Sequence, residues 1–338
     1  MASRPRSVLI VTDAWYPQVN GVVRSIDKTA EEMRRLGIKV DLITPADYRT
    51  LPMPSYPEIG LALTTSGPVV RRIEALAPDA IHIATEGPLG WIARNYCMRR
   101  RLPFSTAYHT QYPEYLRARL PVPLRWSYSL MQRFHRPATA CLVGTPHLMT
   151  LLEARGFSNI ALWTKGVDTE QFNPSRRARL PYPGPVFLYV GRVAVEKNIG
   201  AFLALDLPGT RLVVGGGPSL EQLKKQHPDV TFVGPQHSDE LARYYASADA
   251  FVFPSRTDTF GLVLLEALAS GTPVAAYPVT GPIDVIGNAP VGILADDLQA
   301  AALKALDIPR HACRTYAEGF SWSASTEQFL AHLPTIVR

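Results

Sequence analysis

Two acidic residues stand out in the segment SRTDTFGLVLLEALASGTPVAA, residues 255–276. Asp258 lies in a polar turn, whereas Glu266 lies inside a predicted apolar helix that ends at Gly271 and Pro273. A buried carboxylate is costly unless it is paired or hydrogen-bonded, while the backbone N–H groups that begin such a helix attract anions. One ligand with a phosphate and sugar hydroxyl groups would satisfy both features. The amides concerned belong to Thr259, Phe260, Gly261 and Leu262.

Two cations, Arg192 and Lys197, follow another apolar run in the segment YVGRVAVEKN. Fixed cations in a closed site stabilise the negative charge that develops on a phosphate leaving group. Most Arg and Lys side chains are simply solvated surface charges. The position at a predicted strand end favours the binding interpretation for this pair.

Three further polar or flexible positions lie at predicted strand ends. Gly21, after Asn20, would let the backbone approach a phosphate or sugar oxygen closely or adopt a positive φ, and a plain strand-to-helix turn is the alternative. His109 ends an apolar strand and is suited to bind a sugar hydroxyl or to act as an acid–base group, unless it is a core histidine. For Asp13, a contact with a ligand and a purely structural role in a turn are equally good interpretations.

The glycine run VVGGGP, residues 213–218, resembles a dinucleotide-binding loop only superficially. Leu220 stands where the third glycine of G-x-G-x-x-G would be, so no nicotinamide cofactor is predicted. A glycine-rich loop that lines a cleft is the better interpretation.

A basic and aromatic segment covers residues 115–136. Its composition suits an anionic membrane surface and a lipid acceptor, although a domain helix with a solvated basic face is an equal alternative. Residues 1–165 carry a net charge of +9 and residues 166–338 a net charge of −3, which also favours an anionic partner. No nucleic-acid-binding motif accompanies this charge. The candidate surface residues are Arg117, Arg119, Arg125, Trp126 and Arg133.

Short runs rich in Val, Ile and Leu alternate with helical patterns, for example the helices predicted over 21–36 and 88–101. This alternation predicts an α/β fold with two doubly wound, Rossmann-like domains and a cleft between them. The predicted domains are residues 1–165 on the acceptor side and 186–320 on the nucleotide side, joined by a linker over 166–185. Residues 321–338 form a C-terminal helix that can cross back to the first domain.

The composition, with 46% hydrophobic and 19% charged residues, is that of a globular protein. No apolar run reaches the roughly 18 to 20 residues that a membrane span needs. Three scattered cysteines give no disulfide framework and suggest a reducing cytoplasm. The eight histidines show no metal-binding spacing, so no metal is expected.

Five motifs in order, PQVNGVVRSI, YHTQYPEYL, KGVDTEQFNP, YVGRVAVEKN and SADAFVFPSRTDTFGLVLLEALASGTPVA, resemble the retaining GT-B glycosyltransferases of family 4. The resemblance covers nearly the whole chain and is strongest for the branch that glycosylates diacylglycerol or mannosylates lipids.

The resemblance also implies roles for the candidate residues. Glu266 would hold the nucleotide ribose, and Arg192 and Lys197 would grip the diphosphate. The amides of residues 260–262 would meet phosphate or sugar oxygens, Gly21 would approach the diphosphate, and His109 would contact the donor sugar. Asp258 departs from the family's usual Glu, so its contact to the sugar is shifted or relayed.

The expected activity is transfer of a hexosyl unit from a nucleotide sugar to a lipid such as diacylglycerol, at the inner face of the cytoplasmic membrane. A UDP-sugar donor, glucose or glucuronate, is favoured, and the resemblance implies a retaining reaction without a metal or other cofactor. A GDP-mannose-dependent mannosyltransferase is the alternative in the same class. A UDP-sugar 2-epimerase-like isomerase and a binding module without turnover are the alternatives in other classes.

Overall fold

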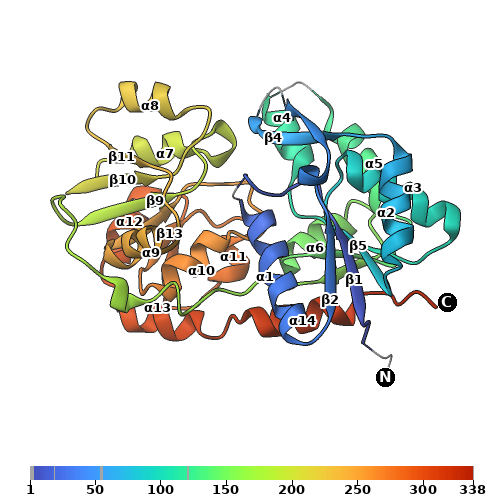
Figure 1. The fold of residues 1–338 in the computed structure, drawn as a ribbon. Helices are drawn as coiled ribbons and strands as arrows, with labels where there is room; N and C mark the ends of the chain where they lie inside the picture. Colours follow the sequence, from blue (N-terminus) through green and yellow to red (C-terminus); the bar gives the residue numbers. More distant parts are fainter. Residues whose placement is uncertain (1–3, 19, 54–55, 120–121, 338) are drawn as a thin grey trace. The chain divides into compact units, whose positions relative to one another are not determined.

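The chain folds into two compact units, the first formed by Met1–Thr164 with Trp322–Arg338 and the second by Lys165–Ser321 (Figure 1). The structure is a computed structural model that describes residues 4–18, 20–53, 56–119 and 122–337. The last helix, α14 (Trp322–Ala331), belongs to the first unit and packs beside α1 (Gly21–Arg35). The chain therefore returns to its first unit after building the second.

The first unit is built on a parallel six-stranded sheet with the order β2-β1-β5-β6-β7-β8. An antiparallel hairpin of β3 (Arg49–Met53) and β4 (Tyr56–Leu63) forms a separate two-stranded sheet in this unit. The sheet strands are β1 (Ser7–Val11), β2 (Lys39–Ile43), β5 (Ala80–Ile83), β6 (Ser105–Ala107), β7 (Ala140–Val143) and β8 (Ile160–Leu162). The other helices are α2 (Ser66–Leu76), α3 (Pro88–Arg100), α4 (Tyr112–Arg119), α5 (Leu124–His135) and α6 (Pro146–Glu153).

Strand β1 shows why these strands read as unbroken apolar runs. Val8 and Ile10 pack in the cluster that includes residues of α1 and α14, whereas Leu9 and Val11 pack in the cluster that includes residues of α2 and α3. Because successive side chains point to opposite faces and helices cover both, every position must be apolar.

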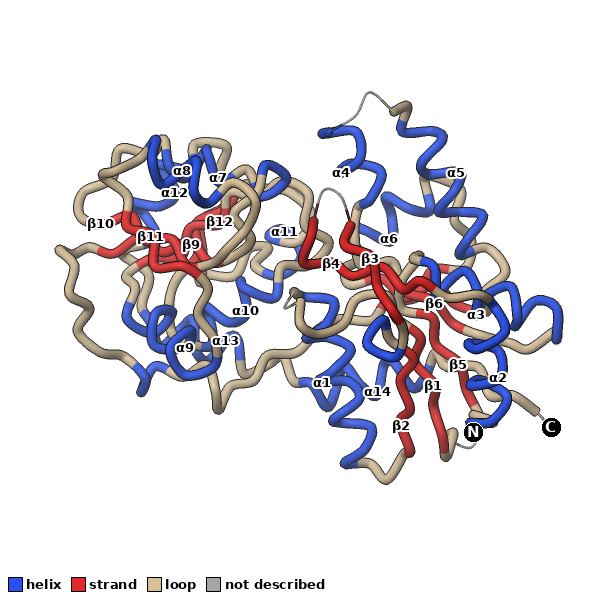
Figure 2. Tube along the Cα trace, turned by 45° about the horizontal axis from the view of Figure 1, so that its top comes forward, coloured by secondary structure: helices blue, strands red, loops and turns tan. Residues whose placement is uncertain are grey.

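The second unit has a parallel sheet with the order β11-β10-β9-β12-β13-β14. Figure 2 shows its strands with helices on both faces. The strands are β9 (Val186–Val190), β10 (Thr210–Val214), β11 (Thr231–Gly234), β12 (Ala250–Phe253), β13 (Val274–Ala276) and β14 (Gly292–Leu294). The helices are α7 (Ile199–Leu203), α8 (Leu220–Gln226), α9 (Ser238–Ser247), α10 (Leu262–Ala269), α11 (Pro282–Val285), α12 (Leu298–Ala305) and α13 (Arg310–Ala317).

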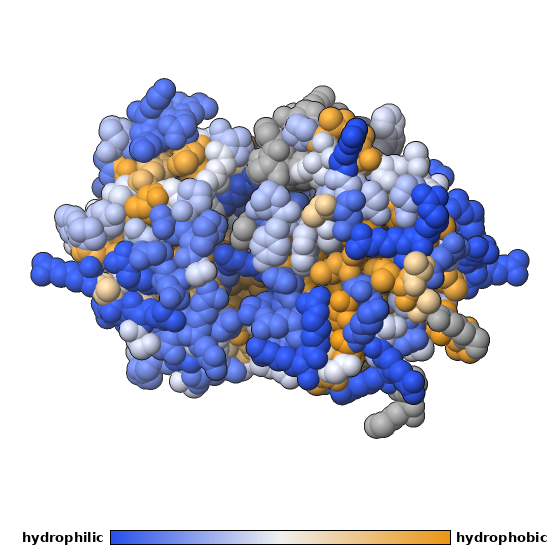
Figure 3. Space-filling view, viewed as in Figure 1, coloured by the Kyte–Doolittle hydropathy of each residue, from blue (hydrophilic) through white to orange (hydrophobic). Residues whose placement is uncertain are grey.

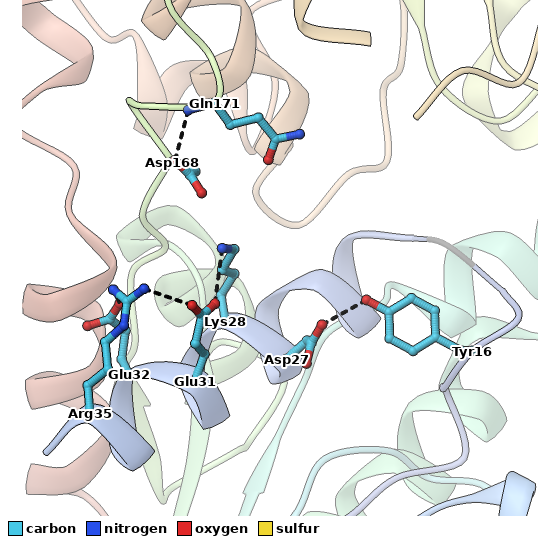
Figure 4. A network of polar contacts seen from close by, with 8 residues as sticks. All are labelled: Tyr16, Asp27, Lys28, Glu31, Glu32, Arg35, Asp168 and Gln171. Carbon is cyan, nitrogen blue, oxygen red and sulfur yellow. Dashed lines mark hydrogen bonds and ion pairs between the residues drawn. The ribbon is translucent and has the colours of Figure 1, made fainter. Parts of the chain in front are cut away.

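Residues 166–185, predicted to be a linker, are part of the second unit. Val167, Phe172 and Leu180 are buried in its core. Asp168 Oδ1 also accepts a hydrogen bond from the backbone N–H of Gln171 at 3.0 Å (Figure 4). The segment therefore packs as part of a folded unit.

Each sheet has a point at which the strand order changes direction. It lies between β1 and β5 in the first unit and between β9 and β12 in the second. Ligands of open α/β sheets bind outside the carboxyl ends of the strands at this switch point. A ligand-binding site is therefore expected at the loops that follow β1, β5, β9 and β12.

Parts of the helix surfaces away from the sheets are hydrophilic, on α1 and α8 for example. On α1, Glu31 pairs with Lys28 and with Arg35 at 3.1 and 2.8 Å, and the Tyr16 hydroxyl donates to Asp27 at 2.7 Å (Figure 4). Helix α8, rich in Glu, Lys and Gln, is strongly hydrophilic on the face drawn in Figure 3. Exposed pairs of this kind contribute at most about 1 kcal/mol each.

Candidate functional site

The loop after β9 carries the two predicted cations at the switch point of the second unit. The Arg192 Nε lies 3.8 Å from Glu196 Oε1, and the Glu196 side chain is only 3% exposed. The Tyr189 hydroxyl donates to the backbone oxygen of Arg192 at 2.7 Å. The hydrogen bond from Tyr189 therefore anchors the loop to the strand that precedes it. Arg192 lies beside a buried carboxylate, that of Glu196.

Lys197 pairs with Asp258, which follows β12 on the other side of the same switch point. The Lys197 Nζ lies 2.5 Å from Asp258 Oδ1, and the two side chains are 22% and 16% exposed. A hydrogen bond from Thr257 Oγ1 to the Glu196 backbone oxygen, 3.2 Å long, joins the two loops. Asp258 Oδ2 is buried and has no hydrogen-bond partner among the described residues, so it is placed to accept a bond from a ligand hydroxyl.

The N-terminus of α10 follows directly. Gly261 precedes the helix with φ +84° and, having no side chain, cannot cap the first turn itself. Phe260 is buried, and Gly261 lies against Leu264 and Phe253. The amides near Thr259 and Leu262 lie in the turn that begins α10, and their contact with an anion stays a prediction.

Glu266 lies further along α10 and is 5% exposed. Its Oε2 accepts a hydrogen bond from the hydroxyl of Tyr245, on α9, at 2.9 Å. This bond offsets part of the cost of burying the acid.

The glycine run after β10 has a packing role. A Cβ on Gly215 would lie 1.9 Å from the Gly191 backbone oxygen, and one on Gly217 would lie 2.4 Å from that of Val193. The Val193 N–H donates to the Gly216 oxygen at 2.9 Å. The glycines thus let this loop press against the loop that carries the two cations.

In the first unit, the carboxylate of Asp13 caps α3. It accepts hydrogen bonds from the amides of Leu89 and Gly90 at 2.9 and 3.1 Å, and from Thr85 Oγ1 at 3.1 Å. Burial raises the pKa of Asp13 to about 6 against the opposing effect of these bonds. Both oxygens are used, which supports the structural interpretation of this residue.

Gly21 is the first residue of α1, and the left-handed backbone considered for it is not observed. The Asn20 side chain already accepts the amides of Val22 and Val23 at 3.0 Å each. The predicted contact of Gly21 with a diphosphate remains a prediction.

His109 lies two residues beyond β6, with its ring edge-on to that of Trp163 at 5.5 Å between centroids. Trp163 is itself fixed by a hydrogen bond from Nε1 to Ser325 Oγ, 3.1 Å long. The ring of His109 is thus oriented by a buried aromatic partner, and its role toward a sugar stays a prediction.

Sequence reasoning missed a buried polar chain at the same edge of the first sheet. Glu86 follows β5 and contacts His135, which contacts Thr106. Glu86 follows a predicted strand in TEGPLG and could have been found by that position. His135 is brought there from the end of α5, so no local signal marks it.

The predicted basic and aromatic surface lies on α4 and α5. Trp126 is 64% and Leu130 50% exposed, and Arg125 and Arg133 are exposed on the same face of α5. Arg117 is exposed on α4, whereas the side chain of Arg119 lies outside the described residues. The opposite face of α5 buries Tyr128, Met131 and Phe134.

Two kinds of feature are absent from the described part of the chain. No helix there combines the length and the apolar character that a membrane span requires. No group of three or more His, Cys, Asp or Glu side chains is arranged there to hold a metal ion.

Comparison with known proteins gives two family matches. Residues 19–171 match the family model "Glycosyltransferase Family 4", and residues 172–307 match "Glycosyl transferases group 1". A GDP-mannose-dependent alpha-mannosyltransferase of Mycobacterium tuberculosis is 32% identical over 85% of this chain and 83% of its own length. The alpha-monoglucosyldiacylglycerol synthase of Streptococcus pneumoniae is 28% identical over 88% of this chain and 77% of its own.

Solved structures show the same fold at low sequence identity. Sucrose-phosphate synthase from Thermosynechococcus elongatus superposes with a TM-score of 0.76 at 22% identity, covering 96% of this chain and 97% of that one. Anabaena HepE, solved with UDP and glucose, gives a TM-score of 0.71 at 15% identity, with 96% and 98% covered. With its two Rossmann-like sheets, the chain belongs to the family 4 glycosyltransferases of GT-B fold and is a hexosyltransferase.

Proposed function

We propose that this enzyme transfers a hexosyl unit from a nucleotide sugar to a lipid acceptor. The observation that carries the donor half is the Lys197–Asp258 pair at the switch point of the second unit, beside the N-terminus of α10. The cations and amides supply positive charge for a diphosphate, and the unpartnered oxygen of Asp258 supplies an acceptor for a sugar hydroxyl. Glu266 is proposed to hold the ribose diol, since a carboxylate accepts two hydrogen bonds.

GDP-mannose is the donor that we place first. Three relatives are named GDP-mannose-dependent alpha-mannosyltransferases, at 29 to 32% identity over 85 to 99% of this chain. The sequence alone favoured a UDP-sugar, and the name of the S. pneumoniae alpha-monoglucosyldiacylglycerol synthase supports transfer of glucose as the second candidate.

A lipid acceptor is supported by the outer face of α5. Exposed Trp126 and Leu130 are apolar anchors, and Arg125 and Arg133 beside them would attract anionic headgroups. Nearby lies an open depression lined by Arg117, Val122, Pro123, Leu124 and Arg125. We propose that this face rests on an anionic membrane without crossing it.

The proposed chemistry is a retaining, metal-independent front-face reaction. The sugar–phosphate bond breaks, the acceptor hydroxyl attacks from the same face, and its proton passes to the departing diphosphate oxygen. Arg192 and Lys197 would stabilise the charge on that oxygen, and His109 and Gly21 keep their predicted roles toward the donor.

The test is a mass-spectrometric transfer assay with anionic vesicles that contain dioleoylglycerol. GDP-mannose, UDP-glucose, UDP-glucuronate and UDP-galactose are offered separately, each with and without the lipid. A lipid that gains one hexose from a single donor supports the proposal and identifies the donor. An isomerised donor in the lipid-free reaction would instead favour the epimerase-like alternative, and hydrolysis alone would contradict the lipid acceptor.

A further inference from the structure

The switch point of the first unit holds a buried carboxylate–histidine pair that has no role so far. Glu86 Oε1 lies 3.1 Å from His135 Nε2, and the two side chains are 6% and 0% exposed. His135 Nδ1 lies 2.9 Å from Thr106 Oγ1. A buried ion pair often stabilises a fold no better than apolar residues of the same volume. Its position at the carboxyl ends of the central strands therefore points to a function.

The histidine is held rigidly. Arg94, which is 7% exposed, donates from Nε to the Phe134 oxygen at 2.9 Å. Asn159 Nδ2 donates to the His135 oxygen at 3.0 Å. These bonds fix the last turn of α5, so the imidazole presents a fixed donor to Glu86.

The charge state of the pair is also defined. Burial favours the neutral ring, but contacts with Cys141 and Glu86 outweigh it and raise the pKa of His135 to about 10. The raised pKa favours the protonated ring, whose two nitrogens lie next to oxygen acceptors on Glu86 and Thr106. The Glu86 side chain is therefore held in a fixed orientation at this edge of the sheet.

Asp13 and Glu86, the two acids at this switch point, differ in how many of their carboxylate oxygens already accept hydrogen bonds from the protein. Asp13 uses both oxygens on Thr85, Leu89 and Gly90. Within the described residues, no hydrogen bond reaches Oε2 of Glu86. Of these two acids, Glu86 is the one that retains an acceptor atom for a ligand hydroxyl.

We propose that Glu86 binds the acceptor by accepting a hydrogen bond from its hydroxyl groups, with His135 and Thr106 as positioning residues. This inference rests on the proposed function, because it needs an acceptor that carries a hydroxyl. The carboxylate takes no proton in the reaction. It orients the acceptor hydroxyl before the attack, and as the new bond to the sugar forms that hydroxyl turns its proton from Glu86 to the departing diphosphate oxygen.

The test compares Glu86→Gln with wild type by measuring KM for the acceptor and for the donor separately. The acceptor is dioleoylglycerol in vesicles or soluble methyl α-mannoside, whichever the wild type converts. We expect the acceptor KM to rise about 10- to 100-fold, the value of one charge-assisted hydrogen bond, with little change in the donor KM. Thr106→Val, which keeps Glu86, should shift the acceptor KM in the same direction by less.

Glu74→Gln is the matched control, because it removes a carboxylate that pairs with exposed Arg100 on the same unit. Equal rises in both KM values, or a loss of thermal stability with unchanged acceptor KM, would overturn the inference even if the wild type is active. Conversion of the soluble mannoside alone would contradict the lipid acceptor and leave the Glu86 comparison intact. A wild type that converts neither acceptor would overturn both proposals.

Discussion

Replacement of Gly215 by alanine tests whether the glycine run supports the cation-bearing loop or binds the ligand itself. The new Cβ would lie 1.9 Å from the Gly191 oxygen, whereas real Cβ contacts stay above 3.0 Å, so one backbone must move by at least 1.1 Å. Overpacking of a tight contact costs about 1–3 kcal/mol. The φ of +143° adds about 1–3 kcal/mol of strain for a residue with a side chain. We therefore expect a loss of about 2–6 kcal/mol in the unfolding free energy.

The assay is thermal unfolding without ligand, followed by calorimetric titration with GDP and UDP. A loss of this size corresponds to about 5–20 °C in Tm for a unit of this length, with weaker nucleotide binding because Arg192 moves with Gly191. The matched control is Gly200→Ala in α7, where a Cβ would have nothing within 4 Å. Gly215→Ala with an unchanged Tm and abolished nucleotide binding would refute the packing argument and make the run a ligand-binding loop.

Three further results are expected. Lys197→Ala should lower turnover about 10²- to 10³-fold by leaving the diphosphate charge unstabilised, with exposed Lys224→Ala on α8 as control. Near-normal turnover in both Lys197→Ala and Arg192→Ala would remove the diphosphate assignment. Asp13 has a folded pKa of about 6 against an ordinary 3.8, so its contribution to stability is full below pH 3.8 and is lost as the pH rises through 6. In chemical unfolding, Asp13→Asn should therefore lower the free energy of unfolding, relative to wild type, by up to about 3 kcal/mol more at pH 4 than at pH 7. Parallel curves of unfolding free energy against pH for the two proteins would contradict a buried, protonated Asp13. Trp126→Ala should weaken salt-sensitive binding to anionic vesicles. Met98→Ala, which removes an apolar side chain that is 46% exposed on α3, should not.

The fold class followed from the sequence because parallel strands buried on both faces leave an unmistakable pattern. The helices predicted over 21–36 and 88–101 end within one residue of α1 and α3. The β3–β4 hairpin was missed because Pro52 and Pro57 interrupt its alternation. The edge strands β8 and β14 were missed because each has only three residues and these are only partly buried, unlike those of the equally short β6 and β13.

The site divided along a similar line. Positions directly after a strand could be predicted, because the end of an apolar run marks them, and Arg192, Lys197 and Asp258 all lie in such loops. The partner of each side chain could not, since the Lys197–Asp258 pair joins residues 61 positions apart. The glycine run was predicted to line a cleft. Only the packing shows that it allows the loop after β9 to approach closely.

Hydrogen-bond satisfaction separates structural acids from candidate ligand acids in this chain better than burial does. Asp13 is a buried carboxylate at a switch point, yet three donors saturate it, so a ligand could bind there only by breaking bonds that hold α3. Asp258 and Glu86 each keep one oxygen on a fixed cation, Lys197 or His135, and leave the other without a partner among the described residues. A carboxylate with one oxygen held by a cation and the other without a hydrogen bond is pre-organised to accept a ligand hydroxyl. Binding then costs no rearrangement of the protein. If Asp258→Asn and Glu86→Gln raise the KM of donor and acceptor respectively, while Asp13→Asn changes only stability, this distinction will have been shown to follow from bonding rather than from burial.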